Sequence, residues 1–215
     1  SANQIESGTA GFIPTWKGTP NKLKYRCASL YIDHSSSFIS ITLHQSTGSE
    51  ESLSAKLQFE LFARENGIKI KKYRADNGTF ASKAFKKSCK VSGQKIDFCG
   101  VNAHHQNGIV ENKNKILTQG GRTLLLHGMR MWPQMVDEMF WPFALKAVAE
   151  RLNTLQIDSL GRTPESILHG IDIDDIPVKS FHTLFCPIYV LDARLQNAGG
   201  AGPPKWEPRS RIGVY

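Results

Sequence analysis

The segment between Tyr25 and Leu43 constrains the fold most, because it holds two different strand patterns separated by a short polar turn. The apolar run Tyr25–Ile32 predicts a strand that is buried on both faces. In Phe38–Leu43, every second residue is a branched aliphatic and the residues between are Ser or Thr, which predicts a half-exposed strand. The polar residues 33–37 are typical of a turn, so the two strands are expected to form an antiparallel hairpin.

Helix and strand patterns alternate after this hairpin. A helix is predicted from Ser49, with acids in its first turn, a buried stripe of Leu53, Leu57 and Leu61, and Gly67 just past its end. The further elements predicted are a strand at Ile68–Tyr73, a helix at Phe80–Cys89, a strand at Ile96–Cys99, a helix from about Ile109, a helical block at Pro133–Leu152, a short helix capped by Thr163 and ending at His169, and a late strand at His182–Leu191. This order predicts an α/β fold, with an antiparallel start and parallel additions.

Composition limits the partners and the compartment. The chain has 215 residues, and 27 Lys and Arg against 19 Asp and Glu give a formal net charge of +8, which favours an anionic partner, nucleic acid first. The length fits one domain with a tail, and no apolar run is long enough to cross a membrane. The four cysteines form no CxxC pair, which favours a reducing compartment inside the cell, nuclear or cytoplasmic. Both ends are expected to be cut from a longer chain.

Two carboxylates stand where chemistry could occur. Asp76 follows a predicted strand, and open α/β sheets bind ligands beyond the carboxyl ends of their strands. An Asp before Asn-Gly could equally cap its own turn. Glu111 lies in the first turn of a predicted helix, and a wheel of about 100° per residue places it on one face with Lys115, Thr118 and Arg122. That face could be a solvated Glu–Lys pair, or an acid that binds metal followed by bases that contact phosphates.

Paired carboxylates suit hard divalent cations. Mg²⁺ and Mn²⁺ prefer oxygen ligands, and often take few from protein and the rest from water and substrate phosphate. Two such ions about 3.5–4 Å apart would activate an attacking hydroxyl and stabilise the leaving oxygen. That arrangement normally needs a third carboxylate.

Several ordered motifs resemble the integrase core of copia-type retrotransposons, a group within the retroviral integrase-like, RNase H-like superfamily. The motifs are Arg74-Ala75-Asp76-Asn77-Gly78, His105-Gln106-Asn107-Gly108-Ile109-Val110-Glu111, Arg162-Thr163-Pro164-Glu165 before His169-Gly170, Phe185-Cys186-Pro187-Ile188-Tyr189-Val190, and the closing Arg209-Ser210-Arg211-Ile212-Gly213-Val214-Tyr215. The resemblance covers nearly the whole chain. It implies a catalytic core at residues 1–170 and an extension at 171–215 that leads toward the next module of a polyprotein.

The resemblance also implies a function. It implies an RNase H-like fold and a DDE triad that uses two Mg²⁺ or Mn²⁺ ions, processes the 3′ ends of element DNA and joins them to target DNA. Asp76 would be the second acid, Glu111 the third, and these two the metal ligands, with the chain acting as a homo-oligomer on element ends and target DNA. Phosphate contacts would come from bases on two predicted helices: Lys113, Lys115, Arg122, Lys83, Lys86 and Lys87.

The first acid of the triad is missing. In the segment that resembles the family's opening strand, Ala2-Asn3-Gln4-Ile5-Glu6-Ser7, the chain has Asn3 where Asp is expected. Asn keeps one carbonyl oxygen for a cation and loses the negative charge, so weak or absent strand transfer is expected. Asp33 and Glu6 are possible substitutes, although Glu6 would need a register shift. Two alternatives remain open: a catalytically silent DNA-binding fragment of a decayed element, and an RNase H-type nuclease.

Overall fold

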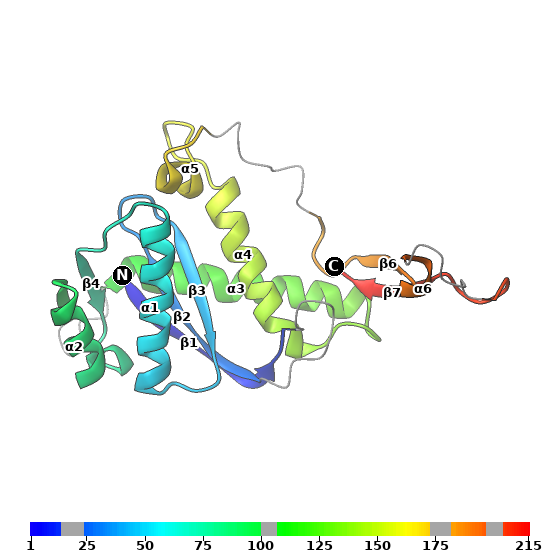
Figure 1. Ribbon diagram of the computed structural model, residues 1–215, viewed down its shortest axis with the longest axis horizontal. Helices are drawn as coiled ribbons and strands as arrows, with labels where there is room; N and C mark the ends of the chain where they lie inside the picture. Colours follow the sequence, from blue (N-terminus) through cyan, green and yellow to red (C-terminus); the bar gives the residue numbers. More distant parts are fainter. Residues whose placement is uncertain (14–23, 100–106, 173–181, 197–203) are drawn as a thin grey trace.

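A three-stranded antiparallel sheet forms the centre of the molecule (Figure 1). The computed structural model describes residues 1–13, 24–99, 107–172, 182–196 and 204–215. The sheet contains β1 (Ala2–Gly11), β2 (Tyr25–Ile32) and β3 (Ile39–His44), in that order. Next to β1 lies β4 (Lys72–Ala75), which pairs in parallel with β5 (Lys95–Phe98). The predicted α/β class with an antiparallel start and parallel additions is therefore confirmed.

Helices cover both faces of the central sheet. On one face α1 (Ser49–Glu65) and α2 (Lys83–Val91) enclose a core that includes Tyr31 and Phe85. On the other face α3 (Gly108–Met131) and α4 (Trp141–Leu155) enclose a second core around Leu30. The alternation along β2 separates the two cores, since neighbouring residues of a strand point to opposite faces. The sheet is thus the middle layer of a sandwich.

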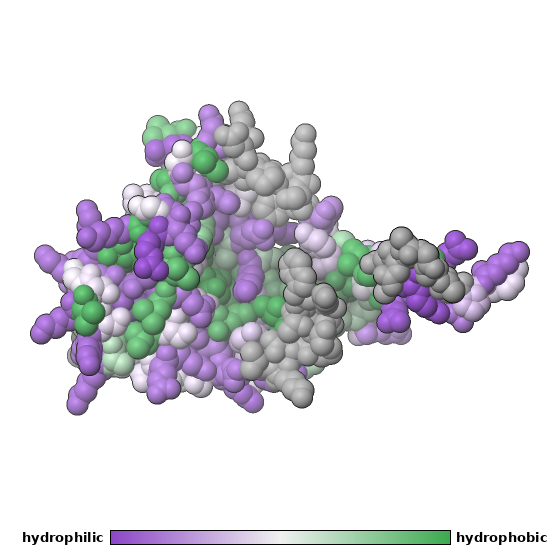
Figure 2. All heavy atoms as spheres, in the orientation of Figure 1, coloured by the Kyte–Doolittle hydropathy of each residue, from purple (hydrophilic) through white to green (hydrophobic). Residues whose placement is uncertain are grey.

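The buried face of α1 is not the predicted stripe of leucines. Leu57 is 52% exposed and Leu61 is 45% exposed, and Figure 2 shows hydrophobic residues among hydrophilic ones on this face of the molecule. The residues that the helix buries are Ser52, Ala55, Lys56 and Ala63. The prediction of a buried stripe of Leu53, Leu57 and Leu61 was wrong because a charged residue occupies the inner face, and a hydrophobicity pattern counts that face as polar.

A buried ion pair explains how Lys56 occupies the interior. Its ammonium lies 2.7 Å from Glu60 Oε1, with side-chain exposures of 0% and 19%, and it donates to Ser88 Oγ of α2 at 3.0 Å. Glu60 Oε1 also accepts from the Tyr73 hydroxyl at 2.9 Å and from Gln94 Nε2 at 2.6 Å. The Lys56–Glu60 pair therefore joins α1, α2, β4 and the residue that precedes β5.

Two adjacent glycines of α3, Gly120 and Gly121, allow a close helix crossing. A Cβ atom at Gly120 would lie 3.0 Å and 3.1 Å from the two methyl carbons of Val148, and one at Gly121 would lie 3.6 Å from the Leu145 nitrogen of α4. Gly121 is buried at this contact. Two glycines in a helix cost about 1 kcal/mol each relative to Ala, and here they let α3 and α4 approach closely. The position of α3 against the sheet depends on that approach.

Several predicted element boundaries move in the structure. The strand predicted at 68–73 begins only at Lys72, and the helix predicted at 80–89 is a 3₁₀ turn, η1 (Thr79–Ala81), followed by α2. The late strand predicted from 182 begins at Pro187, because Phe185 has a positive φ of 64° that interrupts extended backbone. Of the extension predicted at 171–215, the structure describes residues 171–172, 182–196 and 204–215.

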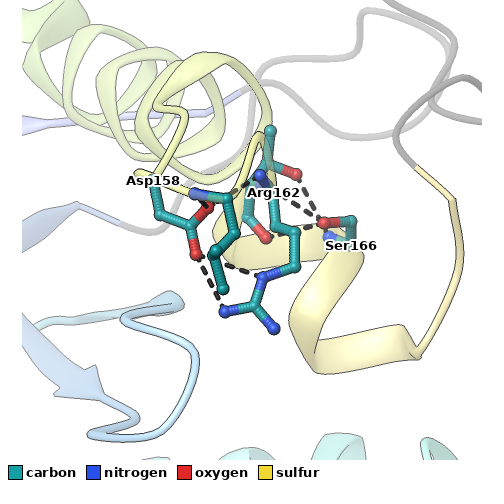
Figure 3. A network of polar contacts seen from close by, with 5 residues as sticks. Asp158, Arg162 and Ser166 are labelled. Atoms are coloured by element: carbon teal, nitrogen blue, oxygen red, sulfur yellow. Dashed lines mark hydrogen bonds and ion pairs between the residues drawn. The ribbon is translucent and has the colours of Figure 1, made fainter.

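One of the remaining elements precedes α4 and the others follow it. A 3₁₀ turn, η3 (Glu138–Phe140), precedes it, and α5 (Pro164–His169) follows, capped as predicted by Thr163, whose side chain accepts from Ser166 N. Figure 3 shows the Asp158–Arg162 pair just before this cap, where Arg162 Nη2 lies 3.0 Å from Asp158 Oδ2. The elements at the C-terminal end are β6 (Pro187–Leu191), α6 (Ala193–Gln196) and β7 (Ser210–Val214), of which β6 and β7 form a separate two-stranded sheet.

Asn153 of α4 clamps the edge strand β3. Its Oδ1 accepts from Ile39 N at 2.8 Å and its Nδ2 donates to Ile39 O at 2.9 Å, and the side chain is 6% exposed. Asn153→Ala is expected to lower the free energy of unfolding by about 2–4 kcal/mol, because it leaves a buried donor and a buried acceptor without partners. Urea unfolding measures this loss. The exposed Asn112 of α3 is the matched control, and an equal loss in Asn112→Ala would contradict the clamp.

His44 predicts a dependence of stability on pH. The ring is 5% exposed and lies 2.9 Å from Ser29 Oγ, and burial lowers its pKa below the usual 6.5. The unfolded chain therefore takes up this proton first as the pH falls, so stability should decline below about pH 6.5. Urea midpoints at neutral and mildly acidic pH should show the decline in the wild type and a smaller one in His44→Gln. If the urea midpoint falls with pH as steeply in His44→Gln as in the wild type, His44 is not the cause of the decline.

Candidate metal and DNA site

Asn3 lies at the start of the central strand β1. It pairs with Leu30 of β2, and it shares a strand face with Ile5, whose side chain packs in the core covered by α3. The side chain is partly buried, and its Oδ1 accepts from Gln4 N at 2.8 Å. An amide oxygen has a second lone pair, so Oδ1 can still coordinate a cation.

Hydrogen bonds from both neighbours of Asn3 reach the segments that carry the two predicted acids. Gln4 Oε1 accepts from Thr79 Oγ1 at 2.8 Å, and Thr79 comes three residues after Asp76. Ala2 O accepts from Asn107 Nδ2 at 3.4 Å, and Asn107 immediately precedes α3. Glu111 lies in the first turn of that helix. The structure therefore gathers the three segments at one end of β1.

Asp76 follows the carboxyl end of β4. The carboxylate is exposed, and its Oδ1 accepts from Gly78 N at 3.3 Å. The alternative role of Asp76 as a turn cap is therefore present in the fold, through one oxygen. The next residue, Asn77, donates to Cys99 O at 3.0 Å and ties this turn to the end of β5. A carboxylate offers about four acceptor positions, which leaves Asp76 able to bind a metal ion as well.

The helix α3 presents the predicted polar face. Glu111 is partly buried, and Lys115, Thr118 and Arg122 are exposed. Lys113 points elsewhere: its ammonium donates to Gln156 Oε1 at 2.9 Å, just past the end of α4, and burial lowers its pKa. Lys115 and Arg122 thus share the Glu111 face, and Lys113 does not.

The lysines of α2 form a second basic surface. Lys83, Lys86 and Lys87 are all exposed. The ammonium of Lys86 lies 4.9 Å from the ring centroid of Phe98, the last residue of β5. A cation over an aromatic face is held in place without losing its charge. These exposed lysines, like Lys115 and Arg122 of α3, carry charges that could contact phosphates.

The two proposed substitutes for the first acid lie elsewhere. Glu6 is exposed and sits three residues from Asn3, so it lies on the opposite face of β1. Asp33 lies in the β2–β3 turn, where its Oδ2 accepts from Ser35 N, Ser36 N and Ser36 Oγ at 2.7–3.1 Å. The carboxylate of Asp33 stabilises the turn. The geometry thus favours neither residue as a replacement for Asn3.

The donor set tests whether magnesium or manganese would fit. Within the described ranges, no group of three or more His, Cys, Asp or Glu side chains is placed to hold a metal ion. Asp76, Glu111 and the amide oxygen of Asn3 offer two charged ligands and one neutral ligand. Mg²⁺ is often bound by one or two carboxylates, with water and phosphate completing its shell. The residues fit one divalent ion better than the pair that three carboxylates would hold.

Three residues around the site had no role in the sequence predictions: Gln4, Thr79 and Asn107. Asn107 is 4% exposed and holds the start of α3 against β1, while Gln4 and Thr79 hold the Asp76 turn. Asn107 belongs to the motif that ends at Glu111, so the sequence could predict that it lies just before a helix. The Gln4–Thr79 contact joins residues 75 positions apart, and no local pattern predicts it. Residues 100–106, which include His105 and Gln106, lie outside the described residues.

The fold is that of the retroviral integrase catalytic core, which is RNase H-like. The catalytic core domain of HTLV-2 integrase, solved in complex with magnesium in a trimeric form, is 24% identical over 76% of this chain and 94% of its own, with a TM-score of 0.51. The BIV integrase core gives 14% identity, coverages of 78% and 90%, and a TM-score of 0.53. A simian T-cell lymphotropic virus intasome in complex with the PP2A regulatory subunit B56γ is 19% identical, with 98% of this chain and 71% of that chain covered and a TM-score of 0.54.

These similarities establish the fold, and no more, at such low identity. No protein-family model and no curated protein matches the sequence. The described helices include none that is long and apolar enough to cross a membrane.

Proposed function

We propose that this chain is the catalytic core of a retrotransposon integrase of the copia type, a DNA polynucleotidyl transferase by descent whose strand transfer is impaired by Asn3. The observation that supports this most is the pair of hydrogen bonds on either side of Asn3. They hold the Asp76 turn and the start of α3, where Glu111 lies, against one end of β1. A fold alone does not define an activity, but such a gathering of two acids and one amide from three segments supports metal-dependent chemistry.

Each polar residue has a role in this proposal. Asp76 and Glu111 would hold one Mg²⁺ or Mn²⁺ ion, with the Asn3 amide oxygen as a neutral ligand. When bound, the ion would polarise a phosphate and favour ionisation of the attacking hydroxyl. Asn107 and Gln4 are positioning residues, because they reach the site only through the backbone and through Thr79.

DNA is the proposed partner. The bases proposed to contact its phosphates are exposed on two helices: Lys115 and Arg122 on α3, and Lys83, Lys86 and Lys87 on α2. Lys113 remains a candidate contact, although it would first have to leave Gln156. Each phosphate contact should add to the salt dependence of binding. Lys115→Ala and Arg122→Ala are each expected to weaken duplex binding about equally across sequences and to reduce the salt slope by about 1.

Other parts of the proposal follow from the resemblance. Residues 1–170 would form the core, and 171–215 an extension toward the next module of a polyprotein. The separate β6–β7 sheet, which is attached to the core through the buried Phe185, supports this division. The HTLV-2 integrase core has been solved in trimeric and dimeric forms, which supports a homo-oligomer. Action on DNA in the nucleus or cytoplasm is proposed from the resemblance and the composition alone.

A nicking assay in Mn²⁺ distinguishes an enzyme from a silent DNA-binding module. In the Asn3→Asp background, Glu111→Gln is expected to abolish nicking and strand transfer while DNA affinity changes less than about threefold. A silent fragment predicts no nicking in either protein, and DNA affinity that is indifferent to metal and to Glu111→Gln. Cleavage of the RNA strand of an RNA–DNA hybrid, without strand transfer, would instead support the RNase H-type nuclease.

A further inference from the structure

We propose that a cavity beside the candidate metal site binds one unpaired nucleotide of the DNA strand that is held there. This inference rests on the proposed function and names a subsite for its substrate. The cavity has a volume of about 630 Å³ and lies between the β2–β3 turn, α1, α5 and the residues that lead into β4. That size is within the range of small-molecule sites, about 300–1,000 Å³.

Aromatic rings line one side of this cavity: Tyr31, Phe38, Phe59 and Phe62. Tyr31 and Phe59 are stacked with centroids 4.8 Å apart, and Phe38 and Phe62 are stacked with centroids 5.5 Å apart. Aromatic side chains of this kind stack on nucleobases without regard to sequence, because every base has a π-face. In a duplex the π-faces are already stacked on neighbouring pairs, so these rings suit an unpaired base.

Basic residues also line the cavity: Lys69, Lys71, Lys72 and Arg74. All four are exposed, and Lys72 is paired with Asp97. Asp33 is the single acid among the described residues that line the cavity, and its carboxylate already accepts hydrogen bonds within its own turn. The charge of the rim therefore complements a phosphate next to the stacked base.

The cavity and the metal site are close along two segments of the chain. Ser1 and Arg74 line the cavity, and each stands two residues before a proposed metal ligand, Asn3 and Asp76 respectively. Ser1 directly precedes β1 and Asp76 directly follows β4, and two residues of extended chain span at most about 7 Å. A strand whose reacting phosphate lies at the metal site would therefore present a neighbouring nucleotide to the cavity.

The test compares a fluorescein-labelled blunt duplex with the same duplex carrying a short unpaired 3′ tail, in EDTA so that no cleavage occurs. The intact chain is expected to bind the tailed duplex about 5- to 100-fold more tightly, which is the contribution of one stacked base. A 2-aminopurine placed in the tail should lose fluorescence on binding. Equal affinity for both duplexes, with no quenching, would overturn the subsite and leave the proposed function intact.

Variants locate the effect. The double variant Lys69→Glu/Lys71→Glu should reduce the advantage of the tail to less than about twofold, and Phe62→Leu should reduce the quenching while circular dichroism reports an intact fold. Lys90→Glu is the matched control, since Lys90 is exposed on α2 and does not line the cavity. It should lower both affinities in the same ratio. If Lys69→Glu/Lys71→Glu still binds the tailed duplex more tightly than the blunt one by the original factor, the tail binds elsewhere. If the intact chain binds neither duplex, the proposed function itself is contradicted.

Discussion

Replacing Asn3 by Asp is expected to raise strand transfer in Mn²⁺ by about 10²- to 10³-fold. Charge stabilisation by a bound metal ion is worth several kcal/mol in the transition state, and each 1.4 kcal/mol changes the rate about tenfold. The substitution keeps the size of the side chain and adds the missing negative charge at the end of β1, where the Asp76 turn and the start of α3 are already held. No rearrangement of the fold is needed.

The controls for Asn3→Asp separate charge from folding. Asn3→Ser removes the amide without adding charge and should stay at the background rate. The double variant Asn3→Asp/Glu111→Gln should return to that rate, because it again leaves two carboxylates. DNA affinity without metal should not rise in Asn3→Asp, since the change adds a negative charge near a phosphate. If the original chain already matches Asn3→Asp in strand transfer, the impairment assigned to Asn3 is wrong.

Removing Glu60 is expected to destabilise the fold more than the loss of the Asn153 clamp. Lys56 is fully buried and its ammonium depends on Glu60 for neutralisation, with cation–π contacts to Tyr73 and Phe85 at 5.5 and 5.8 Å. Glu60→Ala would leave a buried charge without its partner, so the free energy of unfolding should fall by about 3–5 kcal/mol. Equilibrium unfolding in urea measures the change.

A second variant tests whether the charge is the cause. Lys56→Met/Glu60→Leu removes both charges and fills the space with apolar atoms, and replacing a buried pair in this way is often neutral or stabilising. It should recover most of the stability lost in Glu60→Ala, less the hydrogen bonds that Tyr73 and Gln94 make to Glu60. A double variant as unstable as Glu60→Ala would show that shape, and not charge, governs this core. Tyr73 lies in β4, so the network also fixes the strand that leads to Asp76.

The sequence predicted the parts of the fold that depend on local pattern. The limits of β2, the alternation in β3, the Thr163 cap and the helix that carries Glu111 all follow from residue types within a few positions. Residue pattern alone does not predict strand β1, because polar residues such as Asn3, Gln4 and Glu6 interrupt it. It becomes a strand through its pairing with β2 and its contacts with α3.

The rest of the fold depends on contacts between distant segments. The inner face of α1 carries Lys56, which only the partnership with Glu60 makes possible in the core. Gly120 and Gly121 weaken α3 as an isolated helix. Their role is to let α4 pack closely against α3, which only the folded structure shows. At the site, the sequence predicted each carboxylate separately. It did not predict the hydrogen bonds to Ala2 and Gln4 that bring their segments together.

The most direct test of the account is the position of Mn²⁺ in crystals soaked in that ion, read from anomalous difference density. We expect one peak between the carboxylates of Asp76 and Glu111 in the original chain, with the Asn3 amide oxygen beside it, and a second peak in Asn3→Asp. Density for one ion in the first protein and two in the second would agree with a metal site that lacks one acid. Crystals in which Mn²⁺ binds elsewhere, or leaves Asp76 and Glu111 without a peak in both proteins, would contradict it.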